Sequence, residues 1–300
     1  MLSYLSRDLC NIARAATRFG QSAATSMELG VSRSRFLGIG LEYADFREYQ
    51  EGDDIRYVDW RMTARSLDSS ANDYRLYVKV FHVEQMKNVI LVVDLTNSML
   101  IEDKIASMFY TASLILELSH RLLDKVALVI VGRGVEVIQG LRGRDAVKIL
   151  ENTICEERNV GGDTRLSSIL KIVKPIARKR ASLIVLTDYA HDIEDFEVLS
   201  KIRKVMFIPI AIYINVYRWE VEKPVDRATA GLIDVENLVS IVNSLEEVYK
   251  AIKTHVNHVK AVLSSARANF LEIQGFSDAK IKTARIAEVF LKTRYTYIVI

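Results

Sequence analysis

The sequence predicts an α/β protein whose doubly wound, mostly parallel sheet is covered by helices on both faces. Short apolar runs rich in β-branched residues alternate with longer amphipathic stretches between residues 89 and 214, as strands alternate with the helical crossovers that join them. The runs are almost continuously apolar, which is typical of strands buried on both faces. Three hundred residues, 50% of them hydrophobic and 26% charged, are enough for a substantial folded core.

Residues 1–85 are expected to form an N-terminal helix and an extension that pack on the next domain. The spacing of apolar residues predicts a helix over 4–18, followed by a connector over 20–34 and a strand over 77–83. Between residues 42 and 65, seven acids and four arginines are interleaved with aromatic residues. Arginine bonds carboxylates in bidentate fashion and stacks on rings, so a cross-braced loop region is expected. A candidate partner surface within it consists of Arg47, Asp53, Asp54, Arg56, Asp59 and Arg65.

Residues 86–217 are expected to form the α/β domain itself. The pattern predicts strands over 89–93, 126–131, 135–139, 183–186 and 205–214, and helices over 103–123, 144–156, 164–178 and 196–203. After residue 217 the pattern changes, and residues 218–300 are expected to complete the same globule. Helices are predicted there over about 235–270 and 278–292, with a final strand over 295–300.

Cysteine use, charge and hydropathy indicate the cellular setting. Cys10 and Cys155 lie far apart and have no metal-type spacing, so they are interpreted as buried or incidental thiols of a reducing compartment. The charged N-terminus has no signal-peptide core, and no stretch has the roughly 18 to 20 apolar residues of a membrane span. The net charge of +3 is nearly balanced and gives no support to nucleic-acid binding. A cytoplasmic protein without a membrane span is expected.

Polar side chains stand where predicted strands end. Asp94 ends the first apolar strand and is followed by Thr96 and Ser98, Thr164 follows a Gly-Gly turn, and Asp188 ends a later strand. The carboxyl ends of parallel strands meet at one edge of a sheet, so these side chains are expected to converge. Carboxylate and hydroxyl oxygens suit a hard cation, Mg²⁺ or Mn²⁺. Because the hydroxyls are neutral, such a site keeps positive charge to attract a carboxylate from another protein.

This set of residues resembles the metal-ion-dependent adhesion site of von Willebrand factor A domains. The upstream segments Gly38-Ile-Gly-Leu-Glu-Tyr, Arg47-Glu-Tyr, Gly52-Asp-Asp, Arg56, Val58-Asp-Trp and Thr63-Ala-Arg65 are similar to the signature of a prokaryotic domain-of-unknown-function family of von Willebrand factor A-like proteins. Its members are often encoded beside MoxR-type AAA+ ATPases. The resemblance is strong over about residues 36–100 and weak beyond about 215.

What the resemblance implies is a von Willebrand factor A-like fold and a metal-dependent protein-interaction module. The implied partners are a MoxR-type AAA+ ATPase and a protein ligand offering Asp or Glu, and the implied role is the assembly or maturation of protein complexes. Two departures stand out: the family has serine where Thr96 stands, and Asp163 adds a negative charge beside Thr164. Many relatives also carry two membrane helices upstream.

An enzyme is the main alternative to a non-enzymatic binding protein. A strand ending in an acid also opens phosphatases of the haloacid dehalogenase type, in which that carboxylate, here Asp94, attacks phosphorus. Those enzymes use a second carboxylate two positions on, where this chain has Thr96. His255 and His258 have a spacing that can hold zinc, but no cysteine or third histidine accompanies them.

Overall fold

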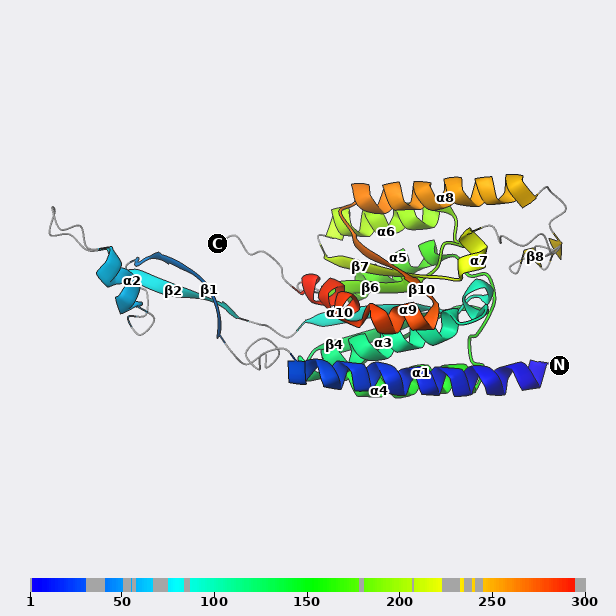
Figure 1. Cartoon of the computed structure of the whole chain (residues 1–300), viewed down its shortest axis with the longest axis horizontal. Coiled ribbons are helices and arrows are strands. Elements are labelled where there is room, and N and C mark those ends of the chain that lie inside the picture. Colours follow the sequence, from blue (N-terminus) through cyan, green and yellow to red (C-terminus); the bar gives the residue numbers. More distant parts are fainter. Residues whose placement is uncertain are drawn as a thin grey trace. The chain divides into compact units, whose positions relative to one another are not determined.

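A six-stranded sheet organises the larger part of the computed structural model shown in Figure 1. Its strands lie in the order β10, β7, β6, β3, β4 and β5. Their bounds are β3 (Asn88–Asp94), β4 (Lys125–Val131), β5 (Val135–Leu141), β6 (Ala181–Thr187), β7 (Ile210–Val216) and β10 (Asn269–Gln274). Neighbouring strands run parallel except β4 and β5. The predicted mixed α/β fold with a mostly parallel sheet is confirmed.

The chain divides into two units, residues 1–27 with 86–300 and residues 28–85. The first 27 residues therefore belong to the sheet-containing unit, as do residues 218–300. The structure describes residues 2–30, 41–50, 55, 58–66, 75–83, 87–177, 181–206, 208–222, 233–234, 239–240 and 245–294. The strand predicted over 295–300 lies outside these ranges.

Helices cover both faces of the sheet (Figure 1). On one face lie α5 (Ile169–Ile176), α6 (Ile193–Met206) and α8 (Leu245–Ser265), whose buried residues share a core with the strands. On the other lie α1 (Leu2–Gly30), α3 (Lys104–Arg121), α4 (Gly143–Cys155), α9 (Gly275–Ile281) and α10 (Thr283–Lys292). Shorter elements are the 3₁₀ helices Asn97–Leu100 and Leu166–Ser168, helix α7 (Arg218–Val221), and the paired strands β8 (Ile233–Asp234) and β9 (Val239–Ser240). Within the described ranges, no helix is both long enough and apolar enough to span a bilayer.

Strand β3 is the centre of the sheet and fixes the position of its terminal acid. Its apolar residues 89–93 are almost fully buried, as their β-branched side chains favour in a strand covered on both faces. β3 pairs with β4 on one side and β6 on the other, with Val93 opposite Leu186. This register places Asp94 and Asp188 at the same carboxyl edge.

The predicted boundaries on the C-terminal side differ from the structure. The helix predicted over 235–270 extends only from Leu245 to Ser265, because residues 239–240 form β9 and residues 269–274 form β10, which pairs in parallel with β7. Arg267, with a φ of 51°, lies in the left-handed region that commonly follows a helix end. The strand predicted over 205–214 begins at Ile210, and its first two predicted residues, 205 and 206, belong to α6.

Helix α1 is longer than predicted and runs through the region expected to be a connector up to Gly30. Gly20 marks close packing there rather than flexibility. A Cβ atom at this position would lie 2.1 Å from Ser113 Oγ and 2.4 Å from the Tyr110 carbonyl oxygen on α3. Glycine is therefore needed for α1 to approach α3 this closely.

A disulfide joins Cys10 on α1 to Cys155 on α4, with their Cα atoms 4.6 Å apart. The interpretation of the two cysteines as incidental thiols is therefore wrong. They are 145 residues apart, and no local pattern marks a bond between two helices brought together by folding. The two cysteines therefore give no indication of a reducing compartment.

The smaller unit contains an antiparallel pair, β1 (Leu41–Glu48) and β2 (Tyr77–Val83), and helix α2 (Trp60–Arg65). The predicted strand over 77–83 is confirmed, whereas part of the expected loop is strand β1. An exposed ion pair between Arg75 and Glu48, with 2.9 Å between Nη1 and Oε1, braces it.

The candidate partner surface falls within this unit. Asp53, Asp54 and Arg56 lie outside the described residues. Asp59 has a structural role, since its carboxylate accepts hydrogen bonds from the Arg61 and Met62 amides and caps α2. Arg47 and Arg65 are exposed on β1 and α2.

Glu117 on α3 is a buried acid paired with two arginines, and this pairing predicts a loss of stability at low pH. Its side chain is 3% exposed, and it accepts two hydrogen bonds from Arg144 and one from Arg121. Burial raises the pKa of Glu117, but the bonds and charges of Arg144 and Arg121 outweigh it, so the pKa lies below its ordinary value of 4.5. The stabilisation is therefore fully present above pH 4.5 and lost as pH falls towards the lower folded value.

We expect Glu117→Gln to lower the melting temperature at neutral pH, with the difference from wild type shrinking below pH 4.5. Thermal unfolding across this range is the measurement. Glu197→Gln, at an exposed glutamate on α6, is the control and should leave the melting temperature nearly unchanged. A difference between Glu117→Gln and wild type that stays constant with pH would contradict the assigned ion pair.

Candidate functional site

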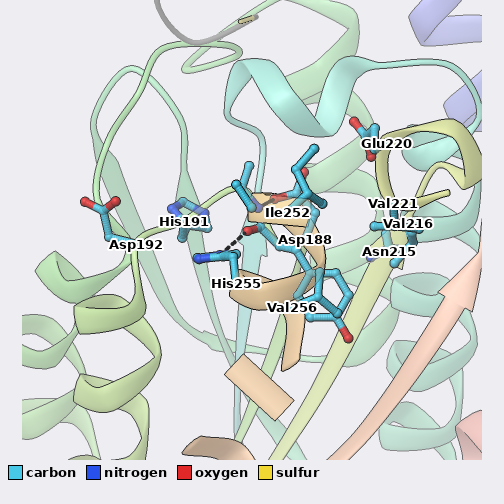
Figure 2. Close-up of a pocket in the computed structure, with 13 residues that line it drawn as sticks. Asp188, His191, Asp192, Asn215, Val216, Glu220, Val221, Ile252, His255 and Val256 are labelled. Carbon is cyan, nitrogen blue, oxygen red and sulfur yellow. Dashed lines mark hydrogen bonds between the residues drawn. The ribbon is translucent and has the colours of Figure 1, made fainter. Parts of the chain in front are cut away.

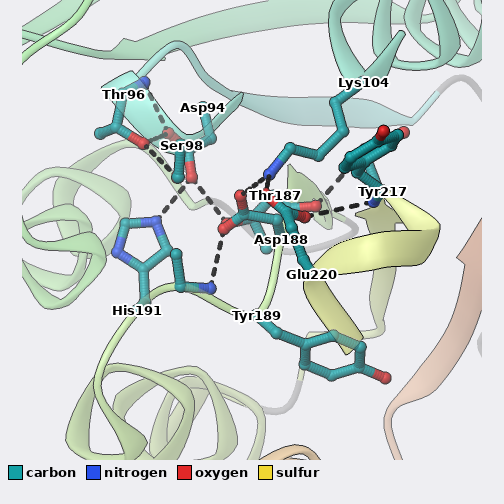
Figure 3. Close-up of polar contacts among 12 residues, drawn as sticks. Asp94, Thr96, Ser98, Lys104, Thr187, Asp188, Tyr189, His191, Tyr217 and Glu220 are labelled. Carbon is teal, nitrogen blue, oxygen red and sulfur yellow. Dashed lines mark hydrogen bonds and ion pairs between the residues drawn. The ribbon is translucent and has the colours of Figure 1, made fainter. Parts of the chain in front are cut away.

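The two predicted acids meet at the carboxyl edge of the sheet, where β3 ends at Asp94 and β6 ends one residue before Asp188 (Figure 3). Both are buried, with 0% and 2% of their surface exposed. Thr96 and Ser98 are also buried in the turn that follows β3, and their hydroxyl oxygens lie 3.4 Å apart. Four of the five predicted ligands are thus brought to one place.

Each carboxylate oxygen of Asp94 has two partners within the protein. Oδ1 accepts hydrogen bonds from the Thr96 amide at 2.9 Å and the Thr96 hydroxyl at 2.7 Å. Oδ2 accepts one from the Thr187 hydroxyl at 2.7 Å and lies 2.6 Å from His191 Nε2. Burial raises the pKa of Asp94, but His191 and these hydrogen bonds outweigh it and hold the pKa below its ordinary value. The carboxylate is therefore ionised.

His191 contributes a positive charge that the sequence reasoning missed. It lies three residues after Asp188, and its Nδ1 is 3.8 Å from Asp195 Oδ2. Burial lowers the pKa of His191, but its bond to Asp94 and the nearby Asp188 and Asp195 carboxylates raise it to about 9. Its position just beyond the end of a predicted strand is the sequence feature from which it could have been predicted.

Lys104, the first residue of α3, contributes a second positive charge. Its Nζ lies 2.8 Å from Asp188 Oδ2 and 2.7 Å from Glu220 Oε1, and its side chain is 1% exposed. Burial lowers the pKa of Lys104, but the charges and hydrogen bonds of Asp188 and Glu220 outweigh it and raise the pKa above 10.5. Asp188 Oδ1 accepts a bond from the Ala190 amide at 2.9 Å. Neither Lys104 nor Glu220 was predicted.

Thr164, the fifth predicted ligand, follows a turn that is held against the Asp94 loop. Gly161 donates to the Leu95 carbonyl at 2.7 Å, and Gly162 exchanges two bonds with Asn97. Both glycines have φ near +80°, which favours glycine. No hydrogen bond between Thr164 and the other four predicted ligands is found, although all five residues are described. Its role as a ligand stays a prediction.

The donor set fits a divalent cation. The Asp94 and Asp188 carboxylates lie within 4.8 Å of each other and of His191, and carboxylate and hydroxyl oxygens are the ligands that Mg²⁺ and Mn²⁺ take. Lys104 and His191 already contact the same carboxylates. Two side-chain cations therefore compete with any metal ion for Asp94 and Asp188. Together with Glu220, the cluster has three acidic and two cationic side chains and a net charge of −1.

A hollow of about 470 Å³ opens beside these acids, between the ends of β6 and β7 and helix α8 (Figure 2). His191 and His255 lie on one side of it in this view, and Asn215 and Glu220 on the other. His255 Nε2 is bonded to the Tyr189 carbonyl oxygen at 2.9 Å, while His258 is exposed. His255 is thus tied to the backbone rather than paired with His258 around zinc.

Residues 45–237 match a sequence family described as a protein of unknown function, DUF58. No curated protein sequence matches the chain. Among solved structures, an aerotolerance-related membrane protein from Bacteroides fragilis is 14% identical with a TM-score of 0.46, over 69% of this chain and 99% of that one. The BatB protein from Bacteroides thetaiotaomicron is 15% identical with a TM-score of 0.41, over 69% and 99%.

The pilus adhesin SpaC from Lactobacillus rhamnosus GG, in its open conformation, is 10% identical with a TM-score of 0.46. That match covers 70% of this chain and 30% of the adhesin. At these identities and TM-scores, none of the three structures supports a functional argument.

Proposed function

The chain belongs to the DUF58 family, whose function is unknown, and from that premise we propose that it is a metal-ion-dependent protein-interaction module with a von Willebrand factor A-like fold. The ion, Mg²⁺ or Mn²⁺, is held at the carboxyl edge of the sheet. When bound, it supplies a positive charge that attracts an Asp or Glu side chain of a partner protein.

The observation that supports this proposal most is the convergence of buried oxygen donors on one edge. Asp94 and Asp188 come from neighbouring strands, yet both are almost fully buried and ionisable. Burying two carboxylates side by side is costly unless positive charge compensates them. Thr96 and Ser98 add neutral oxygens beside them, and Thr164 is the fifth proposed ligand.

The residues of the chain prepare the site in a defined way. The Thr96 and Thr187 hydroxyls orient the Asp94 carboxylate, and the Ala190 amide orients Asp188. Lys104 and His191 neutralise the carboxylates when no ion is bound. Their charges keep the fold stable without a cation and weaken the affinity for it, so binding is expected to be reversible.

We expect Mg²⁺ or Mn²⁺ to raise the melting temperature of the wild-type protein, because an ion that binds the folded state stabilises it. The gain is about 2.7 kcal/mol when the cation is at roughly 100 times its Kd. Asp94→Asn should abolish most of the increase. Differential scanning fluorimetry with and without a chelator is the measurement.

Asp124→Asn is the matched control for this experiment. Asp124 is equally buried but lies just before β4, at the opposite edge of the sheet, where it is paired with Arg294. This variant should have a lower melting temperature but an unchanged increase with cation. Equal increases in Asp94→Asn and wild type would remove the cation site.

The proposed partner is a MoxR-type AAA+ ATPase, in the assembly or maturation of protein complexes, and this part of the proposal follows from the family signature around residues 36–100. Capture of such an ATPase should require the cation and be lost in Asp94→Asn. The enzymatic alternative predicts metal-dependent turnover of phosphoesters that disappears in the same variant. Turnover of that kind would replace the binding function with catalysis by Asp94.

A further inference from the structure

Two adjoining hollows form a groove that leads away from the candidate cation site. The first, of about 470 Å³, contains Asp188 and His191 in its wall. The second, of about 610 Å³, lies beside it between α8 and the β10 residues Glu272 and Gln274. Both are lined by Tyr189, Val221 and Val256, so they meet at a shared wall. We call these two hollows together the α8 groove.

The unpaired charge in the α8 groove is positive. Lys250 and Lys253 line the second hollow, are exposed, and make no ion pair with a residue that the structure describes. The third lysine of that hollow, Lys260, is paired with Glu272 at 2.8 Å. Glu272 also accepts a hydrogen bond from the Tyr189 hydroxyl at 2.8 Å.

The acids of the groove are likewise paired within the protein. Asp188 and Glu220 share the Lys104 ammonium, and Glu222 pairs with Arg218 at 2.8 Å. Asp192 lies 3.4 Å from Arg165. An incoming acidic group therefore meets carboxylates that each contact a cationic side chain, and two lysines that have no ion-pair partner among the described residues.

The middle of the groove is apolar. Val221 from α7 and Ile252 and Val256 from α8 line the first hollow, which Figure 2 shows beside Asp188. An apolar side chain buried there removes hydrocarbon surface from water. The groove thus combines a candidate cation site, an apolar wall and two lysines that make no ion pair within the described part of the chain.

We propose that the α8 groove binds an acidic segment of a partner protein. One carboxylate of the segment lies at the cation site, an apolar side chain packs on Val221, Ile252 and Val256, and further acidic residues face Lys250 and Lys253. The proposal rests on the proposed function for the first of these contacts and stands independently of it for the other two. It defines the class of peptide that the module selects.

The test begins with selection from a phage-displayed library of random dodecapeptides on the full chain in Mg²⁺. The consensus is expected to contain an acid, a neighbouring apolar residue and further acids. A consensus without acidic residues, or the absence of any enriched peptide, would overturn the proposal. Preferred binding of RNA over these peptides would also overturn it, because it would assign the lysines to phosphate groups.

The fluorescein-labelled consensus peptide is then titrated against variants, with fluorescence anisotropy as the readout. Lys250→Glu/Lys253→Glu should weaken its binding by about tenfold or more, because two attractive charges become repulsive. The matched control, Lys148→Glu/Lys174→Glu, makes the same change in net charge at exposed lysines on α4 and α5 and should leave the Kd unchanged. Equal loss in both double variants would overturn the proposal.

The pattern of losses separates this inference from the proposed function. If Asp94→Asn abolishes peptide binding and Lys250→Glu/Lys253→Glu does not, the cation site stands and the groove is refuted. If the charge reversal abolishes binding and neither Asp94→Asn nor chelation affects it, the groove stands and the cation-dependent function is refuted. Loss of affinity in both variants supports both.

Discussion

Replacing Lys104 with methionine is expected to destabilise the cation-free protein by about 3–5 kcal/mol, the usual cost of removing one partner of a buried ion pair. The ammonium group is 2.8 Å from Asp188 and 2.7 Å from Glu220, and Asp188 has almost no access to water. In Lys104→Met, the buried Asp188 carboxylate loses the ammonium group that neutralises it. Urea denaturation in the presence of a chelator gives the free energy of unfolding.

The same variant should respond more strongly to Mg²⁺ than wild type, because Lys104 no longer competes for Asp188. Glu220→Gln is the control: it leaves the bond between Lys104 and Asp188 in place, and the Glu220 side chain is 32% exposed. Its effect should be well below that of Lys104→Met. A loss under about 1 kcal/mol in Lys104→Met would contradict the assigned buried pair.

Reducing the disulfide between Cys10 and Cys155 is expected to lower the free energy of unfolding by about 2–5 kcal/mol. The bond closes a loop between residues 145 positions apart, so it restricts the unfolded chain strongly and holds α1 on α4. Comparison of oxidised and reduced wild-type protein in urea tests this without changing a side chain.

Thiol labelling after denaturation provides the control for that comparison. The oxidised protein should expose no reactive thiol, and the reduced protein two. Cys10→Ala/Cys155→Ala should unfold like the reduced wild type and show no response to reductant. Two labelled thiols in protein purified without reductant and denatured in urea would show that the bond does not form.

The local sequence pattern predicts most strands of the sheet, because their amino-acid composition differs from that of the helices and loops. The segments ending at Asp94 and Asp188 are apolar and rich in β-branched residues, and the structure has strands at both. β10 was missed because Asn269, Glu272 and Gln274 interrupt its apolar residues and it follows a long helix. It becomes a strand through pairing with β7, which no local pattern records.

The candidate site, like the sheet, could be predicted from the sequence only in part. Residues at strand ends follow from topology, so Asp94 and Asp188 could be placed together before any coordinates. Lys104 and Glu220 could not, because they are 116 residues apart and meet through the packing of α3 and α7. The disulfide was missed for the same reason. Sequence periodicity identifies which face is buried but not which distant charges meet across it.

If Asp94 and Asp188 hold a divalent cation, the chain must bind Mn²⁺, and this binding can be measured directly. Electron paramagnetic resonance during titration of the chelator-treated chain with Mn²⁺ counts bound and free ions. We expect one site per chain, displaced by excess Mg²⁺, lost in Asp94→Asn and retained in Asp124→Asn. Mn²⁺ that stays free in the presence of the wild-type chain, or that binds wild type and Asp94→Asn equally, would contradict this expectation.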